Sequence, residues 1–311
     1  MPFAKAVILG ATGPVGIDIA DELRKRGVAV RAVSRNMGHL EALFPGLSAE
    51  RVAADLLKPD DTKRAVDGCD VVFHCVGFGG DAMQHHRTAA ENLAAALAGN
   101  RPPRCVHVSS YWAFLPLVGN PLNEDHPRQG GPPWVRHRRA AEDILREAGA
   151  AIVNLPDFYG PHVHTSTLQQ PLAEAAQGKT MHWIGALDVE REYAFVPDAA
   201  RTIVSLAERD EAYGEHWLIP TAGPLNGRRA AEIVNEILVS KIKVRGLGKT
   251  SLRVLGWFNA PLRGMMQIIP EYVKPIRYET LKITNLLGPQ PVTPYEDGIR
   301  QTLDWLRSRA E

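Results

Sequence analysis

The stretch Lys5-Ala6-Val7-Ile8-Leu9-Gly10-Ala11-Thr12-Gly13-Pro14-Val15-Gly16 joins a short apolar run to three glycines that are spaced three residues apart. A helical pattern with a polar face follows it as far as Lys25. This order of strand, tight turn and helix is typical of a loop that binds a dinucleotide, because the helix N-terminus offers free N–H groups to phosphate. The first glycine permits the turn, the second lets the backbone approach a pyrophosphate, and the third lets the helix pack closely on the strand. The residues predicted to hold a nucleotide cofactor here are Gly10, Thr12, Gly13, Pro14, Val15 and Gly16.

The first 160 residues alternate short β-branched runs with helical patterns. Alternation at this spacing implies right-handed crossovers and a parallel sheet that is covered by helices on both faces. We therefore predict an α/β fold with a doubly wound Rossmann sheet. Strands are expected at 6–9, 29–33, 52–54, 71–76, 105–109 and 152–155, and helices at 15–25, 37–43, 60–66, 83–98 and 136–147.

The organisation changes after residue 160, where prolines and glycines become frequent and the strand patterns are isolated. We expect residues 1–160 to form the dinucleotide-binding domain, with residues 194–220 returning to it. A smaller, mostly helical substrate domain is expected from residues 161–193 and 221–311, over the carboxyl ends of the strands, where open parallel sheets bind ligands. Its expected strands and helices, with those of the returning segment, are strands 181–184 and 217–219 and helices 199–206 and 295–308.

Composition limits the partners. Lys and Arg (36) nearly balance Asp and Glu (35), giving a formal net charge of +1, which argues against nucleic acid or an anionic membrane as the main partner. The start of the chain has too few apolar residues for a signal peptide, and its 3 cysteines form no disulfide framework, so we expect a cytoplasmic protein. His162-x-His164 lacks further ligands nearby, and no metal site is predicted.

An apolar segment near the C-terminus, residues 255–273, is interrupted by Arg263, Gly264 and Pro270 and is therefore not expected to span a membrane. Its first part, 255–262, is expected mainly in a protein core. A contact between the subunits of a homodimer and the wall of an apolar pocket are the alternatives. Whichever of these roles the segment has, a small-molecule substrate is the expected partner of the protein.

The end of the second strand, Val33-Ser34-Arg35-Asn36, has no carboxylate. An acidic residue at this point binds a ribose 2′-hydroxyl, whereas an arginine accommodates a 2′-phosphate. The sequence therefore favours NADP over NAD, with Arg35 on the phosphate and Ser34 beside it. Asp55, after the third strand, is a candidate acceptor for the adenine amino group, and capping of the following helix is its alternative role.

Seven segments together resemble the short-chain dehydrogenase/reductase superfamily, in its extended and atypical branch of NAD-dependent epimerases and dehydratases. They are the glycine loop, Asp55-Leu56, Val71–Gly77, Val106–Ser110, Phe158–Pro161, Arg191–Asp198 and Pro294–Arg300. The resemblance implies a Rossmann fold and a nicotinamide cofactor. It also implies further cofactor contacts at Leu56, Cys75, Val76, Gly77 and Pro156.

In that family a serine or threonine after the fifth strand and a Tyr-x-x-x-Lys pair on the next helix perform the chemistry. The resemblance assigns the serine to Ser110, but Trp134 and Arg138 occupy the tyrosine and lysine positions. An indole does not exchange its proton near neutral pH, whereas Arg138 can still hold ribose hydroxyls of the cofactor. The usual proton relay is therefore expected to be absent. A second Tyr-x-x-x-Lys, Tyr278 to Lys282, lies outside the dinucleotide half, and we interpret it as a chance match.

Two other groups are candidates for the lost role. His137 carries an imidazole, the side chain most suited to exchange a proton near neutral pH, and the resemblance places Tyr159 at the substrate mouth. Their alternative roles are a solvated helix histidine and a tyrosine packed under the second domain. Arg191 matches a position that contacts substrate phosphate in nucleotide-sugar enzymes, and Trp134 stands at the position of the family tyrosine. These two are the predicted substrate-region residues.

The leading hypothesis is an NADP-dependent oxidoreductase that transfers hydride to or from a small or medium organic substrate without the tyrosine relay. Reduction of an activated carbon–carbon double bond fits, because solvent or another side chain can deliver the proton. The alternative is a non-catalytic NADP(H) sensor or scaffold. A nucleotide-sugar epimerase or dehydratase is less favoured, since those reactions generally use the missing tyrosine.

Overall fold

A computed structural model describes residues 3–46, 49–99, 101–248 and 273–309, and its centre is a seven-stranded sheet in the order β10-β6-β5-β4-β1-β2-β3. Every pair of neighbouring strands in this sheet is parallel. The predicted doubly wound Rossmann sheet is confirmed. The strands are β1 (Lys5–Leu9), β2 (Ala29–Ser34), β3 (Glu50–Ala53), β4 (Val71–His74), β5 (Arg104–Ser110), β6 (Ala151–Leu155) and β10 (His216–Leu218).

Helices cover both faces of the sheet because successive strand residues point to opposite sides. Ile8 and Phe73 pack with α1 (Pro14–Lys25) and α7 (Val196–Ala207) on one face. Val7 and Val72 pack on the other face with α3 (Pro59–Val66), α4 (His85–Leu97) and α5 (Pro133–Glu147). A shorter helix, α2 (Met37–Leu43), connects β2 to β3.

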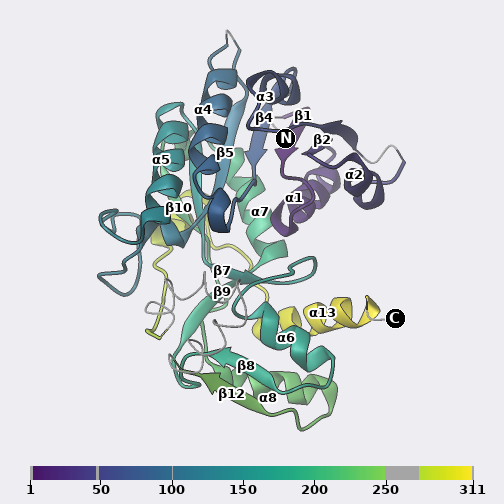
Figure 1. Ribbon diagram of the computed structural model, residues 1–311, viewed down its shortest axis with the longest axis vertical. Coiled ribbons are helices and arrows are strands. Elements are labelled where there is room, and N and C mark those ends of the chain that lie inside the picture. The colour runs from purple at the N-terminus through teal and green to yellow at the C-terminus, as the bar shows by residue number, and fades with distance from the viewer. Residues whose placement is uncertain (1–2, 47–48, 100, 249–272, 310–311) are drawn as a thin grey trace.

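A second part of the molecule lies below the sheet in Figure 1, with the strands β7 and β9 between the two parts. It has its own core, in which Trp183, Tyr193 and Ile299 are buried. Two small sheets, β11-β9-β7 and β12-β8, accompany its helices. Its elements are β7 (Asp157–Tyr159), α6 (Gln169–Ala176), β8 (Met181–Ile184), β9 (Arg191–Phe195), β11 (Pro224–Leu225), α8 (Gly227–Leu238), β12 (Val244–Leu247) and α13 (Tyr295–Ser308). The helix α12 (Leu281–Leu287) instead packs beside β10, with Ile283 in the core of the first part.

Several element boundaries differ from the sequence expectation for local reasons. β4 ends at His74 rather than at residue 76, although Cys75 still donates a backbone hydrogen bond to Leu9 of β1. α5 begins three residues earlier than expected, at Pro133, because proline is well suited to the first turn of a helix. The sequence did not reveal β7, which has 3 residues, since so short a strand shows no alternating pattern.

The apolar segment 255–262 lies outside the described residues. Among the residues that are described, no helix is long and apolar enough to cross a membrane.

Asp18 on α1 gives the fold a pH dependence. Burial, reinforced by the nearby Asp21 carboxylate, raises the pKa of Asp18 from 3.8 to about 7, and its Oδ2 has no hydrogen-bond partner among the described residues. The folded state binds this proton more tightly than the unfolded state does, so protonation of Asp18 stabilises the fold. This contribution is complete below about pH 4 and is lost as the pH rises to about 7.

We expect Asp18→Asn to unfold with a higher free energy than the wild type above about pH 7, by roughly 1–3 kcal/mol, and with an equal one near pH 4. Urea denaturation of both proteins at the two pH values measures the difference. If the difference in free energy of unfolding between Asp18→Asn and the wild type were the same at both pH values, the raised pKa of Asp18 would be contradicted.

Candidate cofactor and active site

The turn between β1 and α1 depends on two of its glycines for steric reasons. Gly10 has a φ of +86°, and a Cβ placed on it would lie 3.0 Å from Cγ2 of Val76. A Cβ on Gly16 would lie only 2.5 Å from the carbonyl oxygen of Gly10 and 2.9 Å from the Cα of Ala11. Side chains at these positions would push the helix away from the strand. This packing is the reason for the spacing of Gly10 and Gly16.

Gly13 has a different role, because a Cβ there would meet only the Gly10 carbonyl oxygen, at 3.4 Å. The helix α1 begins directly after it with Pro14, without a side-chain cap and without an acidic residue in its first turn. Its first N–H groups are therefore left for a ligand, and the helix dipole favours a negative one. The open space above Gly13 and the uncapped helix together fit the pyrophosphate of a dinucleotide. Thr12 and Val15 belong to the same turn and first helical residues.

The predicted adenosine end lies at the tips of β2 and β3. Arg35 is exposed and forms no ion pair or hydrogen bond with any described residue. Ser34 bonds to the backbone of Asn36 within the same turn. Asp55 accepts a hydrogen bond from the backbone of Leu57 (3.1 Å) in the turn before α3, where the N-cap position is held by Lys58. Asp55 therefore does not cap α3, and it keeps acceptor capacity for a ligand.

The other predicted cofactor residues surround the same edge of the sheet. Cys75 and Val76 follow β4 and contact the glycine turn, while Gly77 is exposed beyond them. Leu56 is buried, and its carbonyl oxygen accepts from the side chain of Asn92. Pro156 is also buried and follows β6 directly.

Ser110 ends β5, and its backbone is paired in register with Leu155 of β6. Its hydroxyl oxygen accepts from the amide of Trp112 at 3.4 Å, so its O–H remains available as a donor. Trp134, in the first turn of α5, is half-buried and packs edge-on against Trp112 with ring centroids 5.4 Å apart. Ser110 and Trp134 therefore both contact Trp112 at the carboxyl end of the sheet.

Arg138 lies one helical turn after Trp134. Its Nε is buried and has no hydrogen-bond partner among the described residues. Burial lowers the pKa of Arg138, and the nearby Glu142 carboxylate opposes this shift. A half-buried arginine whose buried Nε is an unused donor fits the ribose hydroxyls of a cofactor, because an unsatisfied buried donor is otherwise costly.

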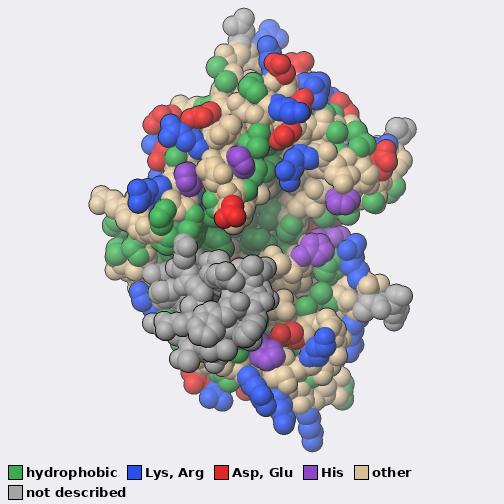
Figure 2. Space-filling view, in the orientation of Figure 1, with side chains coloured by type: hydrophobic (Ala, Val, Ile, Leu, Met, Phe, Trp, Pro, Cys, Tyr) green, Lys and Arg blue, Asp and Glu red, His purple; other side chains and the backbone are tan. Residues whose placement is uncertain are grey.

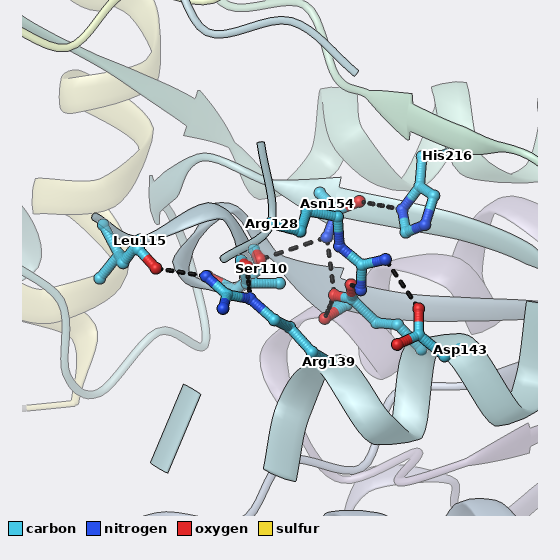
Figure 3. A network of polar contacts seen from close by, with 10 residues as sticks. Ser110, Leu115, Arg128, Arg139, Asp143, Asn154 and His216 are labelled. Atoms are coloured by element: carbon cyan, nitrogen blue, oxygen red, sulfur yellow. Dashed lines mark hydrogen bonds and ion pairs between the residues drawn. The ribbon is translucent and has the colours of Figure 1, made fainter. Parts of the chain in front are cut away.

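A buried polar network lies beside the end of β5 (Figure 3). The Glu142 carboxylate, which is fully buried, accepts from Ser109, from Asn154 (2.7 Å) and from Arg128 (2.7 Å). Asn154 also donates to the carbonyl oxygen of Ser110 at 3.3 Å and bonds to His216. The network therefore ties α5, β5 and β6 together next to the serine.

Glu142 was assigned no role from the sequence. A buried acid cannot be distinguished from a surface acid in one sequence unless its position on the helix is compared with the apolar face. Glu142 lies three residues after Arg139 and three before Leu145, both of which are buried on the same face of α5.

Three further predicted residues lie in different environments. His137 is half-buried on α5, next to Arg138. Tyr159 is 1% exposed and packs against Phe195 and Tyr295 in the core of the second part, so it occupies the packed position that the sequence also allowed. Arg191 is buried on β9, donates to the carbonyl of Ile184 (2.7 Å) and lies over the ring of Trp183.

The two histidines considered as metal ligands, His162 and His164, both pack against the ring of Trp305. Within the described ranges there is no cluster of three or more His, Cys, Asp or Glu side chains that could hold a metal ion.

The structure gives Tyr278 and Lys282, which have the spacing of the family pair, different partners. Lys282 donates to Glu215 (2.7 Å) and to the carbonyl of His216, so it does not assist Tyr278. The ring of Tyr278 nevertheless contacts the ring of Tyr111, which directly follows Ser110. The chain folds back over more than 160 residues to bring them together, and local spacing does not reveal such a contact.

Comparison with known proteins gives a consistent result. Residues 10–153 match a family model described as NAD(P)H-binding. The chain is 23% identical, over 97% of its length and 91% of the relative, to the 4-hydroxy-2-methyl-3-oxo-4-farnesyl-3,4-dihydroquinoline-1-oxide ketoreductase of Stigmatella aurantiaca. It is 29% identical to the sterol demethylase protein B of Methylococcus capsulatus over 68% of both chains. The UDP-glucuronic acid 4-epimerase of Bacillus cereus, solved with NAD, has a TM-score of 0.80 at 15% identity and covers 99% of this chain and 100% of its own.

The fold and the glycine turn define an NAD(P)-binding Rossmann protein. Residues 10–153 thus match an NAD(P)H-binding family, and the fold of the whole chain is similar to that of the epimerase and dehydratase structures of the extended branch.

Proposed function

We propose that the protein uses NADPH to reduce a carbonyl group, or an activated carbon–carbon double bond, on an apolar organic substrate. A bound nicotinamide dinucleotide supplies the hydride. Gly13 and the first turn of α1 hold its pyrophosphate, and Arg138 holds its ribose hydroxyls. The Ser110 hydroxyl donates a hydrogen bond to the substrate oxygen, which Trp134 cannot protonate.

The observation that carries the proposal is the aromatic and apolar wall beside Ser110. Trp112, Trp134 and Tyr278 are only partly buried and pack against a cluster that includes Tyr111 and Leu122. In Figure 2 hydrophobic side chains also line the hollow between the two parts of the molecule. Such a surface favours an apolar substrate over a nucleotide sugar. The names of the two sequence relatives, which refer to a farnesylated ketone and to a sterol, support the same substrate class.

The preference for NADPH over NADH is proposed from Arg35, which is exposed and unpaired among the described residues, and from the absence of a carboxylate beside it. We expect Arg35→Ala to weaken NADPH binding by roughly tenfold or more, because a charge-assisted contact with the 2′-phosphate is lost. NADH binding should not change. Calorimetry with both dinucleotides tests this, and an equal loss for both would assign Arg35 no role in the choice.

Turnover tests the proposal itself. We expect the purified protein to consume NADPH with a 3-keto steroid or a cyclic enone and to leave UDP-glucose unchanged. Tight NADPH binding without turnover of any ketone or enone would overturn it.

One observation favours a second candidate, a non-catalytic NADP(H) sensor: Trp134 occupies the position of the family's proton donor. A sensor must bind NADPH and NADP with different affinities. Equal affinities, together with turnover, would remove this candidate.

A further inference from the structure

A short strap, residues 276–279, runs between the loop after β5 and the strand β9. Leu122 forms two backbone hydrogen bonds of 2.8 Å with one edge of the strap. Glu190 and Glu192 form two of 3.1 Å with its other edge. Tyr278 lies within the strap, so the backbone on both sides fixes where its side chain begins.

Tyr278 is one end of a row of four aromatic rings in contact, and Trp134 is the other end. Its ring meets that of Tyr111 edge-on, with centroids 6.0 Å apart. Tyr111 meets Trp112 at 6.4 Å, and Trp112 meets Trp134 at 5.4 Å. Because Ser110 directly precedes Tyr111, the row connects the strap to the position where the family tyrosine is missing.

Tyr278 is also near the segment that follows the neighbouring strand β6. Asp157, two residues beyond β6, is close enough to act on the ionisation of Tyr278. The ends of β5 and β6 are paired through Ser110 and Leu155, and the carboxyl ends of parallel strands are where such sheets bind ligands. In the part of the chain that the structure describes, the hydroxyl group of Tyr278 has no hydrogen-bond partner, and the side chain is only partly buried.

We propose that Tyr278 replaces the missing family tyrosine, donating a hydrogen bond and then a proton to the oxygen of the substrate. The inference rests on the reductase activity proposed above. In the reduction, the carbonyl carbon gains a hydride from the reduced nicotinamide dinucleotide, and the electron pair of the C=O bond moves to oxygen. The Tyr278 O–H bond breaks as the new O–H bond of the alcohol forms, and water returns a proton to the phenolate.

The ionisation of Tyr278 suits donation rather than removal of a proton. Burial, followed by the effects of Tyr111, Asp157, Glu192 and Tyr193, raises the pKa of Tyr278 well above its ordinary value. The phenol therefore stays protonated across the neutral range, yet it remains a stronger acid than the alcohol that is formed. This arrangement favours reduction over oxidation, which needs a base.

The test compares Tyr278→Phe, which removes only the hydroxyl, with Tyr213→Phe. The Tyr213 hydroxyl donates to the carbonyl of Ala207 and lies outside the proposed site. We expect Tyr278→Phe to lower kcat for a 3-keto steroid by roughly 10²- to 10⁴-fold, with NADPH affinity unchanged. Tyr213→Phe should leave kcat unchanged. Trp134→Tyr, added to Tyr278→Phe, should recover part of the rate by restoring a hydroxyl at the family position.

A binding measurement without cofactor provides a second readout. Quenching of tryptophan fluorescence reports binding of a 3-keto steroid and of the same steroid without the 3-oxygen. The wild type should prefer the ketone by about three- to tenfold, and Tyr278→Phe should lose this preference.

The two proposals fail in different ways. Wild-type kcat and ketone preference retained in Tyr278→Phe would overturn the role of Tyr278 and leave the reductase standing. No turnover by any form would overturn the reductase activity and the proton-transfer step with it. A ketone preference that depends on Tyr278 would then still support its hydrogen bond to the substrate oxygen.

Discussion

Gly13→Ala is expected to lose NADPH affinity on the order of 100-fold while folding as the wild type does. Gly13 has a φ of −82°, which alanine adopts without strain, and its new Cβ would meet only the Gly10 carbonyl oxygen, at 3.4 Å. The methyl group would instead fill the space assigned to the pyrophosphate and block the backbone contact there. Calorimetry measures the affinity, and urea denaturation measures the free energy of unfolding.

Gly16→Ala is the matched control, three residues further along the same turn. Its Cβ would lie 2.5 Å from the Gly10 carbonyl oxygen, so the helix α1 must shift, and we expect a loss of roughly 3 kcal/mol in stability. The two alanines thus separate binding from packing. Unchanged NADPH binding by Gly13→Ala would mean that the pyrophosphate does not lie above this residue.

The parts of the fold that were predicted depend on contacts between near neighbours in the sequence. The turn from Gly10 to Gly16 is a local motif, and the alternation of strands and helices follows from short-range periodicity. Ser110 and Trp134 were assigned from the order of elements, and the structure places both beside Trp112. Whether they act on a substrate stays a prediction.

The parts that were missed depend on contacts between residues far apart in the chain. Tyr278 meets Tyr111 only because backbone hydrogen bonds hold the strap against Leu122 and β9. The spacing of Tyr278 and Lys282 was interpreted as a chance match, and the Lys282 side chain indeed donates to Glu215 rather than to Tyr278. The replacement of the tyrosine on one helix therefore does not exclude that a distant segment supplies a hydroxyl, as we propose for Tyr278.

Glu142→Gln is expected to destabilise the protein by about 3–5 kcal/mol, because it breaks a buried ion pair by removing one partner. The side chains of Ser109, Asn154 and Arg128 all donate to this carboxylate, which is 0% exposed. A glutamine amide offers one acceptor and must turn its N–H₂ group toward at least one of these donors. The Arg128 guanidinium would then lose its buried partner.

The neighbouring residue provides the control, because Asp143 pairs with the same arginine, also at 2.7 Å, but its side chain is 45% exposed. Asp143→Asn should cost less than about 1 kcal/mol, since water replaces most of what the exposed pair contributes. Urea denaturation compares the two variants. Equal losses would show that burial of Glu142 does not decide the strength of the network. A much larger loss for Glu142→Gln would show that the strand end carrying Ser110 is supported mainly by one buried carboxylate, which makes the position of the serine dependent on a residue that never meets the substrate.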